Sequence, residues 1–123
     1  MSLKKACLVL VLIFSALFVD AQKDSLYKQT GMASYYAHKF HGRKTASGEI
    51  FSKDSLTAAH KTLPFGTRIR VTNLKNNQSV IVRVNDRGMK GTNRIVDLSP
   101  AAAKQIDMIR HGLLKVRIEE LPK

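Results

Sequence analysis

Cysteine is almost absent from this chain of 123 residues. The one cysteine, Cys7, lies in an apolar N-terminal segment that we expect to be removed. Without thiols the mature chain can form no disulfide and use no thiolate nucleophile. Its stability must therefore come from burial alone, for which about a hundred residues suffice to build one modest core.

Several motifs of catalysis and cofactor binding are also missing. There is no G-x-x-x-x-G-K-[ST], no dinucleotide-binding fingerprint, no G-x-S-x-G and no H-E-x-x-H. His38 and His41 are close in sequence, but no third ligand stands at a suitable spacing, so we expect no metal site. A serine triad with His60 and Asp86 lacks a serine at a sharp strand-to-helix turn. We therefore expect no cofactor.

The first residues have the layout of a secretory signal peptide. Lys4 and Lys5 precede an apolar run, and Val19-Asp20-Ala21 resembles a cleavage site. The run is short for a transmembrane helix, so a permanent anchor is the less favoured alternative. We predict an exported protein of the periplasm or cell envelope, with a signal peptide at 1–21, a short polar tether at 22–29 and one domain at 30–123.

Acidic side chains are few. The chain has 21 Lys and Arg against 9 Asp and Glu, and its net charge of +12 becomes +11 when Lys4, Lys5 and Asp20 leave with the signal peptide. Such a field attracts nucleic acid, anionic lipid or acidic polysaccharide. Export favours an envelope glycan over nucleic acid. A secreted nucleic-acid binder rests on charge alone, and a solvated basic surface is the neutral alternative.

Alternating apolar and polar residues dominate the rest of the chain, which is typical of strands. Adjacent asparagines indicate a hairpin turn at 75–78, and Ser99 followed by Pro100 predicts the start of one short helix. The pattern favours a small, mostly β barrel of about six strands. We predict strands at 30–37, 67–74, 79–86, 95–98 and 113–121, with shorter ones beginning at Glu49 and within 54–61.

The segment 79–98 carries the pattern most suggestive of chemistry. Val80, Val82 and Val84 share one face of a strand, and if the alternation persists Asp86 lies on that face. A half-desolvated carboxyl group is suited to proton transfer. The alternative is that Asn-Asp-Arg-Gly is only a turn.

Four titratable residues follow predicted strands or turns: Glu49, His60, Asp86 and Asp97. Cleaving a glycosidic bond needs a proton donor, and hydrolysis normally needs a second carboxylate, so Glu49 and Asp86 could form a pair. We expect Asp97 to be structural, bonded to backbone or to Arg94. Aromatic side chains could stack on sugar rings, although at least half should be core: Tyr35, Tyr36, Phe40, Phe51 and Phe65.

Five segments together resemble the RlpA (rare lipoprotein A) family, and the resemblance runs over nearly all of the predicted mature chain. They are GMASYY (31–36), FHGRKTASGE (40–49), LTAAHKTLPFGT (56–67), VNDRG (84–88) and RIVDLS (94–99). The resemblance implies a double-psi β-barrel related to expansins. It also implies a septal-ring type of lytic transglycosylase, which cleaves peptidoglycan glycan strands stripped of their stem peptides.

The resemblance also assigns roles to residues. It implies that Glu49, His60 and Asp86 are catalytic, with Asp86 as the acid and base and the other two orienting and tuning it. In a lytic transglycosylase the attacking group is the C6 hydroxyl of the muramic acid itself, so no water must be positioned. Basic residues near the site would meet the lactyl carboxylates of the glycan. The predicted substrate-binding set is Tyr36, Arg43, Lys44, Arg87 and Arg94.

The chain departs from the family pattern in three ways. Met89 stands where a proline commonly follows Asn-Asp-Arg-Gly, so we expect a looser loop. No lipid-attachment cysteine is visible, and no glycan-binding SPOR domain follows the barrel. The missing cysteine argues against a permanent membrane anchor, and we separately expect a monomer. The alternative to an enzyme is a non-catalytic, expansin-like wall-binding module.

Overall fold

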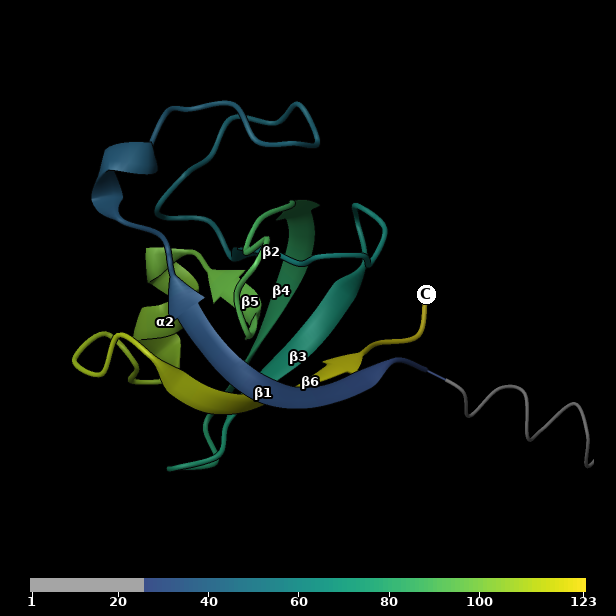
Figure 1. The fold of residues 1–123 in the computed structure, drawn as a ribbon, viewed down its shortest axis with the longest axis vertical. Helices are drawn as coiled ribbons and strands as arrows, with labels where there is room; N and C mark the ends of the chain where they lie inside the picture. Colours follow the sequence, from purple (N-terminus) through teal and green to yellow (C-terminus); the bar gives the residue numbers. More distant parts are fainter. Residues whose placement is uncertain (1–25) are drawn as a thin grey trace, which may run out of the picture.

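Six strands form most of the regular structure in the computed structural model, which describes residues 26–123 (Figure 1). They are β1 (Lys28–Tyr35), β2 (Thr57–Ala59), β3 (Arg68–Asn73), β4 (Ser79–Asp86), β5 (Arg94–Leu98) and β6 (Leu114–Glu120). They close into a barrel in the order β1-β5-β2-β4-β3-β6. The β1–β5 and β2–β4 pairs are parallel, and the other four pairs are antiparallel.

The one α-helix in this part of the chain is α2 (Pro100–Gln105), and a single 3₁₀ turn, η1, spans His38–Phe40. Ser99 caps α2 as predicted, because its hydroxyl oxygen accepts a hydrogen bond of 3.2 Å from the Ala102 N–H. The predicted fold class, a six-stranded barrel with one short helix, is confirmed. No helix among residues 26–123 has the length and apolar character needed to cross a bilayer.

Two local predictions differ from the structure. The first strand begins at Lys28 rather than at residue 30, so the last residues of the predicted tether lie in β1. The strand predicted to begin at Glu49 is wrong, because only an isolated bridge joins Lys44 to Ile50. The turn between them lies against the end of β4 instead of joining a sheet edge. The predicted signal peptide lies outside the described residues.

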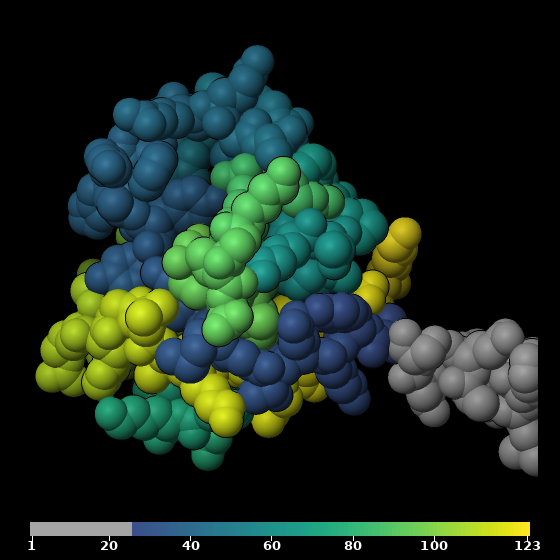
Figure 2. Space-filling view, in the orientation of Figure 1, coloured from purple at the N-terminus to yellow at the C-terminus, as the bar shows by residue number. Residues whose placement is uncertain are grey.

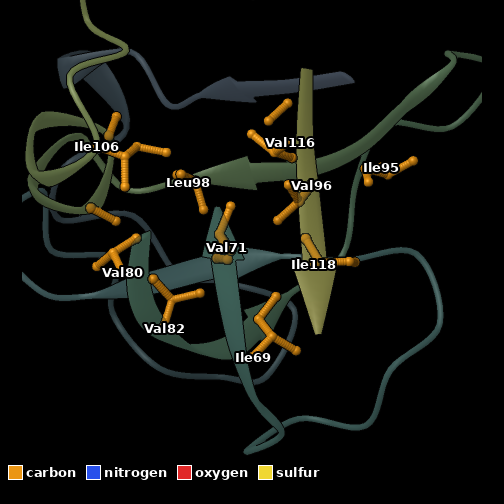
Figure 3. Close-up of a cluster of buried hydrophobic side chains, with 14 of the residues drawn as sticks. Ile69, Val71, Val80, Val82, Ile95, Val96, Leu98, Ile106, Val116 and Ile118 are labelled. Carbon is orange, nitrogen blue, oxygen red and sulfur yellow. The ribbon is translucent and has the colours of Figure 1, made fainter. Parts of the chain in front are cut away.

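Alternation along the strands builds the core. Buried valines, isoleucines and leucines of β3, β4, β5 and β6 meet inside the barrel, and Ile106 adds to them just after α2 (Figure 3). The labelled side chains are Ile69, Val71, Val80, Val82, Ile95, Val96, Leu98, Ile106, Val116 and Ile118. Asn73 is a buried polar residue, 1% exposed, and its side-chain amide donates to the carbonyl of Ile106 at 2.7 Å.

Two connections position the candidate site. The long β1–β2 connection, residues 36–56, rises above the barrel end at which β4 finishes (Figure 1). The β4–β5 loop, residues 87–93, leaves the barrel at the same end. Residues far apart in the sequence are therefore brought together over the end of β4.

Candidate functional site

A cleft of about 630 Å³ lies between these two connections, which stand next to each other in Figure 2. The end of β1 and the β1–β2 connection contribute Tyr36, Phe40, Arg43, Lys44 and Phe51 to its lining. The end of β4, the loop after it and β5 contribute Asp86, Arg87, Gly88, Arg94 and Asp97. Asp86 therefore borders an open cleft and is not enclosed in a turn.

Three donors fix the orientation of the Asp86 carboxylate. Its Oδ1 accepts hydrogen bonds of 2.8 Å from the backbone N–H groups of Ala46 and Arg87. Its Oδ2 accepts one of 2.5 Å from the Tyr36 hydroxyl. Within the described residues this carboxylate forms no ion pair. A carboxylate held in one orientation at the edge of a cleft can exchange a proton with a bound molecule.

A β-bulge sets the position of Asp86. The register with β2 pairs Ala58 with Val84 and Ala59 with Asp86, so Asn85 has no partner. The predicted alternation therefore stops at Val84: Asn85 is buried, whereas Asp86 is only half-buried. Bulges of this kind turn a side chain away from its regular direction. The prediction that Asp86 continues the valine face is corrected accordingly.

Tyr36 packs against two other aromatic rings of the cleft lining. Its ring stacks on Phe51, which is 3% exposed, with 4.4 Å between centroids, and it meets Phe40 edge-on at 5.9 Å. Burial, followed by the hydrogen bond to Asp86, raises the pKa of the Tyr36 phenol well above its ordinary value. The hydroxyl therefore stays protonated and remains a donor to Asp86.

The cleft is rich in positive charge. Its lining has four basic side chains, Arg43, Lys44, Arg87 and Arg94, against two carboxylates. Asp97 is one of these, and it binds Arg94 through two hydrogen bonds of 3.0 and 3.3 Å, as predicted. This ion pair raises the pKa of Arg94 above its ordinary value. The remaining excess of cations suits an anionic ligand.

Arg87 is held at the cleft by two contacts. Its guanidinium lies 4.2 Å from the ring centroid of Phe65, a cation–π distance. Its Nη1 donates to the carbonyl of His60 at 3.2 Å. Because Phe65 and His60 come from the segment after β2, these contacts tie that segment to the end of β4.

The side chain of His60 does not line the cleft. It is 2% exposed, and its Nδ1 accepts hydrogen bonds from the N–H groups of Thr62 at 3.1 Å and Leu63 at 3.0 Å. Burial lowers the pKa of His60, and the charges of Arg87 and Lys61 add to this. Its backbone N–H donates to the Asp86 carbonyl at 3.1 Å, so His60 adjoins Asp86 through the main chain.

Glu49 also lies outside the cleft lining. Its carboxylate is exposed and forms an ion pair of 2.6 Å with Arg83 of β4. The hydrogen bond from Arg83 is the main reason that the pKa of Glu49 lies below its ordinary value. Glu49 and Asp86 therefore do not form a pair of carboxylates that face each other across the cleft.

The structure thus brings together Asp86 and all five residues predicted to bind substrate. The side chains of Glu49 and His60 lie outside the cleft lining, Glu49 exposed and His60 buried. Sequence reasoning missed the N–H groups of Ala46 and Arg87 as partners of Asp86. It also missed Arg83. Backbone N–H donors cannot be predicted from residue types. The only sequence signal for Arg83 was that a charged residue stands within the alternating pattern of β4.

Met89 adopts a backbone conformation that proline cannot share. Its φ is +67°, whereas the proline ring holds φ near −65°. The side chain is 6% exposed, and the Met89 carbonyl accepts from both the N–H and the hydroxyl of Thr92. The β4–β5 loop is therefore an ordered turn whose path depends on a residue other than proline.

Metal-ligating side chains do not gather in the described part of the chain. Within residues 26–123, no three His, Cys, Asp or Glu side chains lie close enough together to hold a metal ion.

Comparison with known proteins finds relatives that match most of the described chain. A family model described as "Lytic transglycolase" matches residues 28–118. The endolytic peptidoglycan transglycosylase RlpA of Campylobacter jejuni is 58% identical over 89 residues, which cover 72% of this chain and 32% of that protein. Its counterpart in Haemophilus influenzae is 56% identical over 95 residues, covering 77% of this chain and 33% of that protein. The chain thus spans about a third of the length of these curated relatives.

Solved structures support the fold. The Streptomyces papain inhibitor superposes with a TM-score of 0.63 at 22% identity, covering 78% of this chain and 96% of the inhibitor. An expansin of Clavibacter michiganensis gives a TM-score of 0.62 at 20% identity, covering 79% of this chain and 52% of the expansin. These proteins share the barrel, and at such identities they bear on the fold alone.

Proposed function

This chain belongs to the lytic transglycosylase family of RlpA-type domains, and on that premise we propose that it cleaves peptidoglycan glycan strands and leaves 1,6-anhydro-muramic acid ends. The observation that carries the proposal is the Asp86 carboxylate, held by three donors at the edge of an open, cationic cleft. We further propose that the protein acts in the cell envelope, where this polymer is found.

Asp86 is the proton-transferring group in this proposal. In its acid form it protonates the glycosidic oxygen as the bond to the anomeric carbon breaks. The C6 hydroxyl of the same muramic acid then attacks that carbon and gives its proton to the Asp86 carboxylate, which restores the acid. Because the nucleophile is tethered to the reacting sugar, one carboxyl group serves both steps.

The other residues orient this group and the glycan. Tyr36 fixes Oδ2 of Asp86, and His60 joins the ends of β2 and β4 through its backbone contacts with Asp86 and Arg87. We assign Arg43, Lys44, Arg87 and Arg94 to the glycan. A strand without stem peptides exposes one lactyl carboxylate per disaccharide, and this regular negative charge matches the excess of cations along the cleft.

A non-catalytic wall-binding module is the second candidate. The likeness of the barrel to an expansin favours it, since one fold can serve binding and catalysis alike. Both functions would use the same cationic cleft, so binding alone does not separate them. Product chemistry does.

The test uses purified protein and sacculi from which an amidase has removed the stem peptides. We expect anhydro-terminated fragments by mass spectrometry from the wild type and none from Asp86→Asn, which keeps the shape of the side chain but cannot cycle a proton. Asp54→Asn, at an exposed carboxylate away from the cleft, is the matched control and should retain activity. Binding without fragments in the wild type would contradict the enzyme and support the module.

A further inference from the structure

The turn that delivers the Ala46 N–H to Asp86 is attached to the barrel at few points. Residues 44–50 fold back on themselves through the Lys44–Ile50 bridge, and the Thr45 N–H donates to the Glu49 carbonyl at 2.8 Å. At the tip of the turn, Ala46 N–H reaches Asp86 Oδ1 at 2.8 Å and the Ser47 N–H reaches the Asn85 carbonyl at 3.3 Å. These two contacts meet the bulge of β4 that positions Asp86.

One ion pair connects the far side of this turn to the same strand. Glu49 Oε2 lies 2.6 Å from Nη1 of Arg83, three residues before Asp86 on β4. Among the described residues, this is the one salt bridge between the turn and the barrel. The hydroxyl of Ser47 also donates to Glu49 Oε2 at 3.3 Å, so the pair is linked to the tip.

Glu49 also offsets an electrostatic repulsion between Arg83 and a neighbouring arginine. On the neighbouring strand β3, Arg68 stands directly opposite Arg83 in the ladder. Two like charges at opposed positions repel each other. Glu49 supplies the compensating charge, and Arg83 in turn keeps Glu49 ionised below the ordinary range of a glutamate by lowering its pKa.

We propose that Arg83 is a positioning residue for glycan cleavage, because its ion pair with Glu49 holds the 44–50 turn where the Ala46 N–H can orient the Asp86 carboxylate. The inference rests on the proposed function and deepens it, since it explains how Glu49 could affect catalysis without lining the cleft. An exposed ion pair contributes little to stability. A small misplacement of a reacting group, in contrast, costs much in rate.

The test is a charge exchange. Arg83→Glu and Glu49→Arg each place like charges together, and we expect each to lower kcat by roughly tenfold to a hundredfold, with KM nearly constant. The double variant carrying both substitutions restores the pair in reverse and should recover kcat to within about threefold of wild type, because the two sites are coupled. Melting temperatures should differ by only a few degrees among the four proteins.

The matched control is the exposed Arg117–Glu119 ion pair on β6, at 3.2 Å and outside the cleft lining. Arg117→Glu should leave kcat unchanged. A double exchange variant as inactive as Glu49→Arg would overturn the proposal, because it would mean that the Glu49 carboxylate itself is required. Wild-type activity in Arg83→Glu would overturn it as well.

A second readout does not depend on activity. Hydrogen exchange of the Ala46 amide, followed by NMR, should be faster in Arg83→Glu than in wild type and should return to the wild-type rate in the double variant. If wild type releases no anhydro ends but the exchange rates follow this order, the proposed function fails and the ion pair still positions the turn. Equal exchange rates in all four proteins would contradict the positioning role.

Discussion

His60 illustrates how a single residue can matter to the site without facing it. Its imidazole is buried, accepts two backbone N–H groups at Nδ1 and meets the Tyr27 ring edge-on at 5.4 Å between centroids. Since Nδ1 is an acceptor, the neutral ring carries its proton on Nε2. Protonating Nδ1 would break both hydrogen bonds, which agrees with the lowered pKa of His60.

This environment predicts a pH dependence of stability. Below about pH 6.5 the unfolded chain binds a proton at His60 that the folded chain does not, so the free energy of unfolding falls as the pH drops, until the lower folded-state pKa is passed. His60→Asn keeps an acceptor near the position of Nδ1 but cannot titrate. In urea unfolding at several pH values between about 7 and 5, we expect the wild type to lose more stability than this variant.

His111→Asn, at an exposed histidine, is the control and should follow the wild-type profile. Identical pH profiles for wild type and His60→Asn would contradict the neutral, buried imidazole.

For individual residues, the sequence predicted which side chains lie together at the cleft but not all of the contacts that they make. Asp86 and the five predicted substrate-binding residues come from separate motifs, and all six line one cleft. The contacts of Asp86 with Tyr36 and of Glu49 with Arg83 join positions 50 and 34 residues apart. Such pairings depend on how the strands are ordered in the barrel, which residue types alone do not reveal.

The β4–β5 loop is the element whose prediction depends most on one residue. It follows Asp86, carries Arg87 and leads into Arg94 at the start of β5, so its path sets the position of two cations of the cleft. The Lys61 ammonium donates to the Thr92 carbonyl at 2.8 Å and ties the loop to the segment after β2. The positive φ of Met89 sets the turn within it.

Met89→Pro should therefore disturb this element, although it restores the proline of the family pattern. Proline excludes the φ of +67° at this position, so the loop must rearrange, which we expect to cost at least about 1–3 kcal/mol. We expect a lower free energy of unfolding in urea and slower glycan cleavage. Met89→Ala loses the buried side chain without excluding the backbone conformation, and it should retain more activity than the proline variant.

A proline variant as stable and active as wild type would contradict the conformation described for this loop.

The secondary-structure elements were largely predictable from the sequence: β4 begins and ends at the predicted residues, and Ser99 caps α2. The bulge at Asn85 was not, because it arises from pairing with β2 and not from any pattern within β4.

The structure shows where part of the net positive charge of the molecule lies. The sequence predicts a polyanionic partner from its excess of Lys and Arg, and the cleft shows where part of that excess lies. Basic residues elsewhere on the barrel, such as Arg70 and Lys115, are exposed to solvent.

The order of the strands in the barrel could be inferred from the sequence only through the resemblance to a known family. Alternation of apolar and polar residues predicts where strands lie but not which strands pair.

Binding to stripped glycan strands should therefore weaken with salt. Raising the ionic strength from about 0.01 M to 0.15 M shortens the screening length from roughly 30 to 8 Å, so we expect a several-fold rise in the Kd for amidase-treated glycan measured by co-sedimentation. An uncharged chitin oligosaccharide, which lacks the lactyl carboxylate, should show little change. Equal salt dependence for both polymers would contradict the match between the cationic cleft and the lactyl groups.

The central claim is that Asp86 transfers protons during cleavage of a glycan whose own C6 hydroxyl is the nucleophile. The most direct measurement is cleavage by wild-type protein in oxygen-labelled water, with the new sugar ends analysed by mass spectrometry. The account predicts new ends without label, since the C6 hydroxyl closes the anhydro ring and no water enters the product. Labelled reducing ends would contradict it, because they would show hydrolysis by an activated water molecule.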